Sequence, residues 1–266
     1  MIEIRQVLFT KNPRYKDGKR IVPKGIMVHS TGANNPNLRR YVQPDDGLLG
    51  GNIYGTDWNR ETQSLCVHAF IGKDKDGKVR CYQVLPWDYR TYHCGYGPNG
   101  SGNSTHISFE ICEDGLEDRE YFEAVYDMAA ELCAYLCEEF GLKENDVICH
   151  SEGHEIGIAS NHGDVMHWFP KFGKDMDEFR REVGRKIKAN KKTDDSQKTA
   201  DEFEKQIAEY LEKQALKDPS NWSEEARSWA ESAGVITGDE NGNKQYGRFA
   251  TREEIVQMLY NAIGKG

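Results

Sequence analysis

The amino-acid sequence predicts an α/β fold, with a mixed central sheet flanked by helices and a small helical C-terminal domain. Three observations predict it. Short apolar segments with strand character alternate with amphipathic helical patterns as far as residue 190, an order that an α+β fold would also give. Polar residues without apolar periodicity then fill 188–200, and two helical patterns separated by a turn-rich segment follow. We therefore expect a large domain over 1–190, a charged linker and helix over 191–218, and a helical module over 219–266.

The predicted strands of the large domain are short, and several end in polar side chains. The segment HISFEICE (106–113) alternates apolar and polar residues with a period of two, which is typical of a half-buried strand. Ile107, Phe109 and Ile111 would share one face of it, and Glu110 would lie on the other. Two segments that flank the turn-rich DKDGK are predicted to form a β-hairpin. The predicted strands are 2–10, 25–31, 66–72, 78–85, 106–113 and 146–150.

The helical patterns begin with residues 119–140, where apolar side chains recur at spacings of three and four. Gly141 follows and is suited to end that helix. Residues 175–189 repeat the pattern. Residues 201–217 carry apolar side chains on one side, a stripe shorter than a coiled coil needs but able to join two chains into a homo-oligomer.

Composition and charge exclude several classes of protein. The net charge is −9 and neither half of the chain is basic, which argues against a nucleic-acid partner. No apolar run approaches the ~20 residues that span a bilayer. The first twenty residues lack the apolar core and cleavage site of a secretory signal peptide, so we expect synthesis in the cytoplasm. Seven cysteines without a CxxC pair favour reduced thiols over a disulfide framework or a zinc ribbon.

Four separated stretches supply side chains that could form one catalytic site. They are MVHSTG around His29, ISFEIC around Glu110, ICHSEGH around His150, and NHGDVMHWFP around Asp164. Two imidazoles and a carboxylate would form the three-ligand shell of a catalytic zinc, which keeps one position open. Glu110 could deprotonate a water molecule, and His162 could stabilise an oxyanion or protonate a leaving amine.

Spacing alone leaves the choice of ligands open, because other histidines compete for these roles. His150 and His154 are four residues apart and resemble a helical metal pair, but an HExxH motif beginning at His154 would need a histidine where the chain has Ile158. A single histidine is also more often a hydrogen-bonded structural residue than a ligand. The residues by themselves therefore indicate a metal-dependent hydrolase without fixing its site. The competing histidines are His68, His93, His106, His154 and His167.

Five motifs in order along the chain carry a resemblance to a known family. They are VHSTG, VHAFIGKDKDGKVRCYQVLP, YHCG, ISFEIC and CHSEGH…ASNHGDVMHWFP, all between residues 22 and 185. This part of the chain resembles the zinc-dependent N-acetylmuramoyl-L-alanine amidases of the amidase-2 type, which are related to peptidoglycan recognition proteins and many phage endolysins. The resemblance implies a Zn²⁺ cofactor and peptidoglycan as the substrate.

The resemblance also implies roles for individual residues. His29, His150 and Asp164 correspond to the zinc ligands, and Glu110 to the glutamate that handles the water. Many family members carry a lysine two residues before the last ligand, whereas this chain carries His162 there. A histidine donates to an oxyanion only when it is protonated or in the right tautomer.

Three further residues are implied in substrate binding. His68 and His93 resemble family cleft residues and would line the substrate groove, with structural hydrogen bonding as the alternative. Trp168 would either pack on a sugar ring or fill the core.

The C-terminal module resembles a single S-layer-homology repeat through its WAESAGVITG and TREEIVQMLY motifs. Thr251 and Glu254 predict a capping box at the start of its second helix. Such repeats bind secondary cell-wall polysaccharide, and Arg252 would pair with an anionic sugar group. Related proteins usually combine three repeats and this chain has one, so wall binding would require chains to associate through 201–217. A small packing appendage is the alternative.

The sequence therefore predicts a phage or prophage endolysin that cleaves the amide between N-acetylmuramic acid and the L-alanine of the stem peptide. It would be made in the cytoplasm and act on the bacterial cell wall after release. The rival functions are a non-catalytic peptidoglycan-binding module and an endopeptidase that cuts within the stem peptide. The presence of His29, Glu110, His150 and Asp164 together favours the enzyme.

Overall fold

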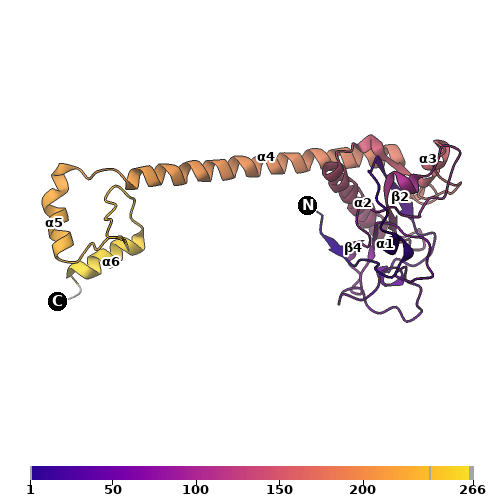
Figure 1. The fold of residues 1–266 in the computed structure, drawn as a ribbon, viewed down its shortest axis with the longest axis horizontal. Coiled ribbons are helices and arrows are strands. Elements are labelled where there is room, and N and C mark those ends of the chain that lie inside the picture. Colours follow the sequence, from indigo (N-terminus) through magenta and orange to yellow (C-terminus); the bar gives the residue numbers. More distant parts are fainter. Residues whose placement is uncertain (1, 240, 264–266) are drawn as a thin grey trace. The chain divides into compact units, whose positions relative to one another are not determined.

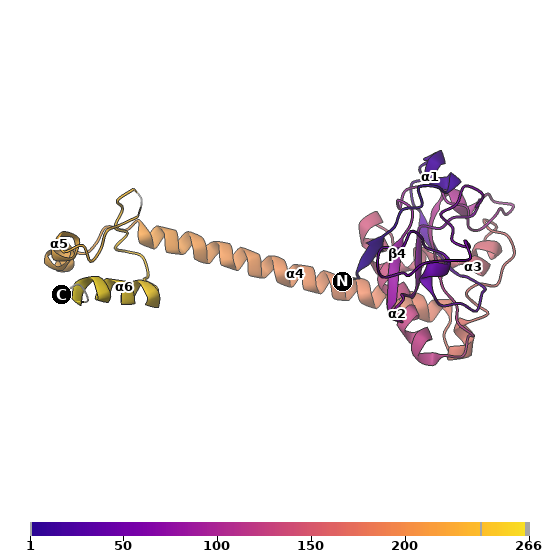
Figure 2. The same cartoon turned by 90° about the horizontal axis from the view of Figure 1, so that it is seen from below.

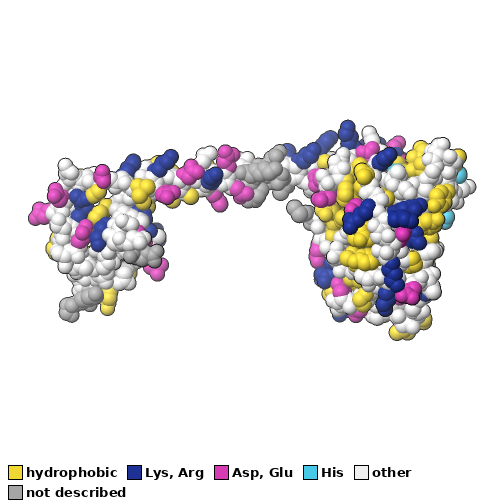
Figure 3. All heavy atoms as spheres, viewed as in Figure 1, with side chains coloured by type: hydrophobic (Ala, Val, Ile, Leu, Met, Phe, Trp, Pro, Cys, Tyr) yellow, Lys and Arg dark blue, Asp and Glu magenta, His cyan; other side chains and the backbone are white. Residues whose placement is uncertain are grey.

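The computed structural model describes residues 2–239 and 241–263, with the backbone alone at 193–198 and 200. Contacts between residues divide the chain into two compact units, Met1–Lys191 and Lys192–Gly266. The first unit contains a sheet and most of the helices, as the ribbon shows from two directions (Figures 1 and 2). Acidic and basic side chains are interspersed on the visible face of both units (Figure 3).

The first unit is built on one mixed sheet of six strands, in the order β1-β4-β3-β5-β2-β6. Strands β3, β5, β2 and β6 run parallel to one another, and β4 runs antiparallel to β3. The carboxyl ends of these four parallel strands therefore meet at one edge of the sheet, and each strand overlaps a predicted one. Their bounds are β1 (Ile4–Gln6), β2 (Gly25–Ser30), β3 (Ala69–Lys73), β4 (Val79–Gln83), β5 (His106–Ile111) and β6 (Val147–Cys149).

Helix α2 (Arg119–Phe140) covers one face of this sheet. It begins where the Asp118 carboxylate accepts a hydrogen bond from the Tyr121 backbone N–H, which satisfies one of the free donors of the first turn. It ends at Gly141, whose left-handed conformation (φ 66°) is the expected stop. The helix therefore has the bounds that the sequence predicts.

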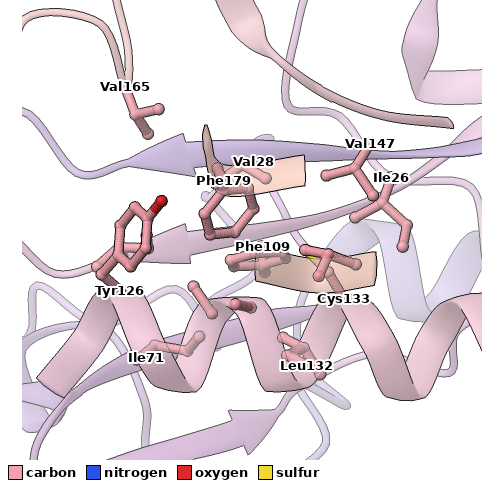
Figure 4. Packing of buried hydrophobic residues seen from close by; sticks show 14 of the residues in the cluster. Ile26, Val28, Ile71, Phe109, Tyr126, Leu132, Cys133, Val147, Val165 and Phe179 are labelled. Atoms are coloured by element: carbon pink, nitrogen blue, oxygen red, sulfur yellow. The ribbon is translucent and has the colours of Figure 1, made fainter. Parts of the chain in front are cut away.

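The main apolar cluster lies between the sheet and α2. Phe109 of β5 and Ile71 of β3 pack near Leu132 of α2, and Phe179 of a later helix also contributes (Figure 4). This confirms the predicted inward face of β5. The opposite face of the sheet packs mainly against loops rather than against a helix. Its cluster includes Phe9, Leu38, Tyr41, Val42 and Leu49.

Helix α4 (Met176–Ala215) runs without interruption through the segment that was expected to be a linker. The linker over 188–200 is therefore helical, and the expectation of two separate helices on either side of it is wrong because they are one. The segment contains neither glycine nor proline and several lysines, alanines and a glutamine, which favour a helix. A lack of apolar periodicity does not by itself exclude a helix, because it reports on burial and not on backbone conformation.

The remaining helices are short, and none of the described helices is long and apolar enough to cross a membrane. In the second unit, Thr251 Oγ1 accepts a hydrogen bond from the Glu254 backbone N–H, and Glu254 Oε2 accepts one from that of Thr251 (3.1 and 2.8 Å). The predicted capping box is thus confirmed. The helices are α1 (Pro13–Asp17), α3 (His150–Glu155), α5 (Glu224–Ser232) and α6 (Arg252–Ile263).

Candidate active site

His29 and Glu110 are partners in register on the neighbouring parallel strands β2 and β5. Successive side chains of a strand point to opposite faces. Ile26 and Val28 of β2 belong to the cluster beneath α2, so His29 lies on the other face. Its imidazole is buried near the carboxyl end of the strand, where the backbone on both sides is held by the sheet.

His150 and Asp164 bring two more donor atoms to His29. His150 opens α3 directly after β6, and Asp164 lies in the loop between α3 and α4. His29 Nδ1 is 2.8 Å from Asp164 Oδ2 and 3.2 Å from His150 Nδ1, and His150 Nδ1 is 3.5 Å from Asp164 Oδ1. All three side chains are buried. In the described part of the chain they form the one group of three such residues that could hold a metal ion.

The spacing of these donor atoms suits zinc. Ligand atoms about 2.0–2.1 Å from a tetrahedral zinc ion are about 3.3 Å from one another, within the range of the distances found here. The tautomers also fit. His29 Nε2 lies 2.7 Å from His93 Nδ1, and His150 Nε2 lies 3.3 Å from Ser160 Oγ. If each Nε2 carries the proton and donates it in these bonds, each Nδ1 presents a lone pair to the cluster.

The charge states of the cluster also suit a cation. Burial lowers the pKa of His150 to about 4 and, with the neighbouring imidazoles, lowers the pKa of His93 well below its ordinary value. Burial of Asp164 opposes its ionisation, but the hydrogen bond with His29 and the nearby imidazoles outweigh it and hold its pKa below the usual range. At neutral pH the cluster therefore offers a neutral His150 imidazole and an ionised Asp164 carboxylate, the forms of these two groups that bind metal.

Glu110 is a carboxyl group without a hydrogen-bonding partner beside this cluster. Its Oε2 atom is buried and makes no hydrogen bond to the described residues. Burial, together with the nearby Asp164 and Glu113 carboxylates, raises the pKa of Glu110 well above its usual value. An unpaired buried carboxyl group of this kind can exchange a proton with a water molecule or a substrate.

His162 lies at the mouth of the cluster. Its Nδ1 atom contacts the Asp164 carboxylate, and its ring lies 5.3 Å from that of His150, centroid to centroid. Its side chain is 63% exposed. The Nε2 edge of its ring makes no hydrogen bond among the described residues.

Two anchoring residues did not emerge from the sequence. Ser160 accepts from His150 as described above, while its own hydroxyl donates to the Cys94 carbonyl oxygen (3.1 Å). Glu113 accepts from His167 Nε2 (2.9 Å) and from the Gly32 N–H (3.1 Å), which ties the loop carrying Asp164 to the end of β2. Glu113 directly follows the ISFEIC motif, and only this position next to a motif could have indicated from the sequence that it lies near the site.

The structure corrects two of the substrate-binding assignments. His68 is fully buried, with Nε2 bonded to the Tyr89 carbonyl (2.8 Å) and Nδ1 accepting from the Ser108 N–H (3.0 Å). Trp168 is fully buried against aromatic residues of α2. Neither lines a groove, because both fill the interior, so those assignments are wrong. His93 lies at the site, but as the partner of His29.

The seven cysteines are all buried and unpaired, which confirms the expectation of free thiols. Burial raises the pKa of the thiols of Cys66, Cys94 and Cys149, so they are neutral near pH 7. None belongs to the metal-binding group of the described residues.

Comparisons with known proteins identify the family of this chain. The N-acetylmuramoyl-L-alanine amidase family model matches residues 18–166. A curated relative, N-acetylmuramoyl-L-alanine amidase CwlH of Bacillus subtilis (strain 168), is 38% identical over 71 residues, so the match spans 27% of either chain.

One of the similar solved structures shows the same fold. The hydrolase AmiA of Staphylococcus aureus, in complex with its ligand, superposes with a TM-score of 0.52 and 22% identity, over 70% of this chain and 83% of that one. PlyL gives a TM-score of 0.48 and 22% identity, over 68% and 97%. Since the family model covers more than half of the residues and all of the buried cluster, the chain belongs to the N-acetylmuramoyl-L-alanine amidase family.

Proposed function

We propose that this chain is a zinc-dependent N-acetylmuramoyl-L-alanine amidase. It would hydrolyse the amide that joins the lactyl group of N-acetylmuramic acid to the L-alanine of the peptidoglycan stem peptide. The observation that carries the proposal is the convergence of two imidazoles and a carboxylate beside an unpaired glutamate. Membership of the family supports it.

His29, His150 and Asp164 would hold the zinc ion through the atoms that already face one another. When bound, zinc supplies a Lewis acid that acidifies water and polarises an amide carbonyl. His93 and Ser160 would keep both imidazoles in the tautomer that presents Nδ1.

Glu110 would accept a proton from the water that adds to the carbonyl carbon, because its Oε2 atom has no competing partner. With both ring nitrogens protonated, His162 would donate from Nδ1 to the Asp164 carboxylate and from the exposed Nε2 edge to the developing negative oxygen. The C–N bond then breaks, the alanine nitrogen takes up the proton and leaves as an amine, and the lactyl group remains on the muramic acid as a carboxylate. Water is the one reagent consumed.

We further propose that the enzyme is an endolysin that lyses the bacterial cell wall after release from the cytoplasm. The second unit would hold it on the wall as an S-layer-homology-like module that binds secondary cell-wall polysaccharide. Arg252 is exposed at the start of α6 and has no ion-pair partner among the described residues, so it is available to an anionic sugar. Two chains could associate through the exposed side chains of Phe203, Ile207 and Tyr210. The pair would then carry two wall-binding modules and bind the wall more tightly than one chain.

The test is product analysis of purified peptidoglycan by mass spectrometry. The amidase releases intact stem peptides that begin with L-alanine and leaves glycan strands with free lactyl carboxylates. Cleavage within the stem would instead indicate the endopeptidase, and binding without any release would indicate a non-catalytic module. Either result contradicts the proposal.

A matched pair of variants makes this test specific. Both His150 and His154 lie on α3, but His154 is exposed and outside the metal-binding group. We expect His150→Ala to abolish peptide release and His154→Ala to retain it.

A further inference from the structure

A hollow of about 410 Å³ lies in the first unit apart from the histidine cluster. Its walls come from two segments of the long connection between β2 and β3, residues 35–40 and 51–56. The connection has no strand and only a short turn of 3-10 helix, so sequence periodicity gave it no role.

One wall of the hollow lies at the edge of the sheet that carries the proposed catalytic site. Lys73, the last residue of β3, donates its backbone N–H to the Pro36 carbonyl (2.7 Å). The Asn35 N–H donates to the Glu113 carbonyl (2.8 Å), just beyond the end of β5. The first wall, residues 35–40, is therefore held at the carboxyl ends of β3 and β5. Glu110 lies on β5, and His29 lies on the neighbouring strand β2.

The second wall, residues 51–56, is hydrogen-bonded to the first. Asn52 Nδ2 and Thr56 Oγ1 both donate to the Arg40 carbonyl oxygen (3.1 and 3.2 Å). Gln43 Nε2 donates to the Gly50 carbonyl (2.8 Å). These bonds use backbone oxygens, so the shape of the hollow does not depend on the arginine side chains.

Two arginines in the lining lack an anionic partner. The guanidinium groups of Arg39 and Arg40 make no ion pair or hydrogen bond with the described residues, although Arg40 lies over the Tyr41 ring. The nearby acids are engaged elsewhere. Asp45 accepts from the backbone of Gly47 and Gly50, and Asp46 from Arg5 and Tyr82.

Two unpaired guanidinium groups in a preformed hollow suit a carboxylate, which arginine binds through two parallel hydrogen bonds. They stand out in a chain of net charge −9. Ile53 and Tyr54 leave large apolar side chains exposed in the same lining, where they could contact the aliphatic part of a ligand. The lining therefore fits an acidic peptide better than a simple ion.

We propose that this hollow binds a free carboxylate of the stem peptide and so selects acidic over amidated peptidoglycan. The inference rests on the proposed function, because it supplies the peptide. Parallel strands lie about 4.8 Å apart, so β3 is about 10 Å from β2, and an extended peptide spans that distance with about three residues. The pocket would therefore contact the stem a few residues beyond the scissile amide.

The test measures binding separately from hydrolysis. An N-acetylated stem tripeptide with free carboxylates and the same peptide with those carboxylates converted to amides are titrated into the zinc-loaded protein by calorimetry. We expect the carboxylate form to bind about tenfold more tightly. The preference should fall to about twofold or less in the double variant Arg39→Gln, Arg40→Gln.

Arg185→Gln is the matched control, because Arg185 is an arginine of α4 that pairs with Glu182, and it should keep the preference. The single variant Arg39→Gln alters an exposed side chain and should lower the preference about threefold if the double variant does not fold. Equal binding of both peptides by the unaltered protein, or a preference that persists in the double variant, overturns the proposal.

Hydrolysis of the matching muramoyl peptides in the same samples separates the two proposals. A binding preference without hydrolysis contradicts the amidase and supports the pocket. Hydrolysis without a binding preference contradicts the pocket alone.

Discussion

The two units of this chain differ in how far they bury their apolar side chains. The first unit packs three buried clusters on and around its sheet. In the described part of the second unit, Ala230 is the single buried hydrophobic residue, and Trp222 is 88% exposed. The first unit can therefore hold a site rigidly by itself. The second is better suited to contacts with another surface, which is where its proposed wall-binding role would lie.

The largest effect should come from the chemistry of the first unit. Glu110→Gln keeps the shape of the side chain but removes the proton acceptor, so we expect the turnover of a soluble muramoyl peptide to fall about 10³-fold. Adsorption of the variant to purified walls should not change, since Arg252 and the second unit are intact. Turnover within tenfold of the unaltered enzyme would contradict the role of Glu110.

Truncation of a phenylalanine should lower the free energy of unfolding much more in the first unit than in the second. Phe109 is fully buried between β5 and α2, whereas Phe249 of the second unit is 66% exposed. We expect Phe109→Ala to lower the free energy of unfolding by about 3–5 kcal/mol. We expect Phe249→Ala to change it by no more than about 0.5 kcal/mol. Chemical denaturation followed by circular dichroism measures both, and similar losses would remove the distinction between the units.

The first unit should also lose stability in mild acid. All eight histidines lie in it, and burial lowers the pKa of His68 to about 4. Unfolded chains bind that proton near pH 6.5, so its contribution is complete above pH 6.5 and is lost as the pH falls towards 4. The expected loss from His68 is about 3 kcal/mol between pH 7 and pH 4.

His106, whose pKa burial also lowers to about 4, adds a loss of the same sign. A His68→Gln variant should show a shallower decline than the unaltered protein when unfolding is measured across this range. An identical slope in both proteins would show that His68 is not buried as a neutral group.

The smallest effect should come from the second unit. Arg252→Gln removes an exposed guanidinium group, so we expect affinity for walls to fall about tenfold while turnover of soluble substrate stays unchanged. Lys205→Gln on α4 is the control for loss of one exposed charge. Equal adsorption of all three proteins would favour the packing appendage over the wall-binding module.

Local patterns predicted most of the first unit. The two-residue period of β5 gave its inward face, and the spacing on α2 gave its length, because both elements have one buried side. The course of α4 could not be predicted from apolar periodicity, since its residues 201–213 are exposed. Helix propensity and the absence of helix breakers were the signals that remained.

The residues of the site were harder to identify from the sequence alone than the elements of the fold. His29 and Asp164 are 135 residues apart, and only the order of the strands brings them together. Resemblance to the family singled them out where spacing could not. His68 and Trp168 lie in the same motifs but are directed inward, because burial depends on the packed tertiary structure and not on the motif.

Metal analysis of the purified protein tests the central claim most directly. After loading with zinc and dialysis, mass spectrometry should find about one zinc ion per chain in the unaltered protein and in His154→Ala. His29→Ala and Asp164→Ala should hold far less. Equal zinc in all four proteins, or none in the unaltered one, would contradict a metal site formed by His29, His150 and Asp164.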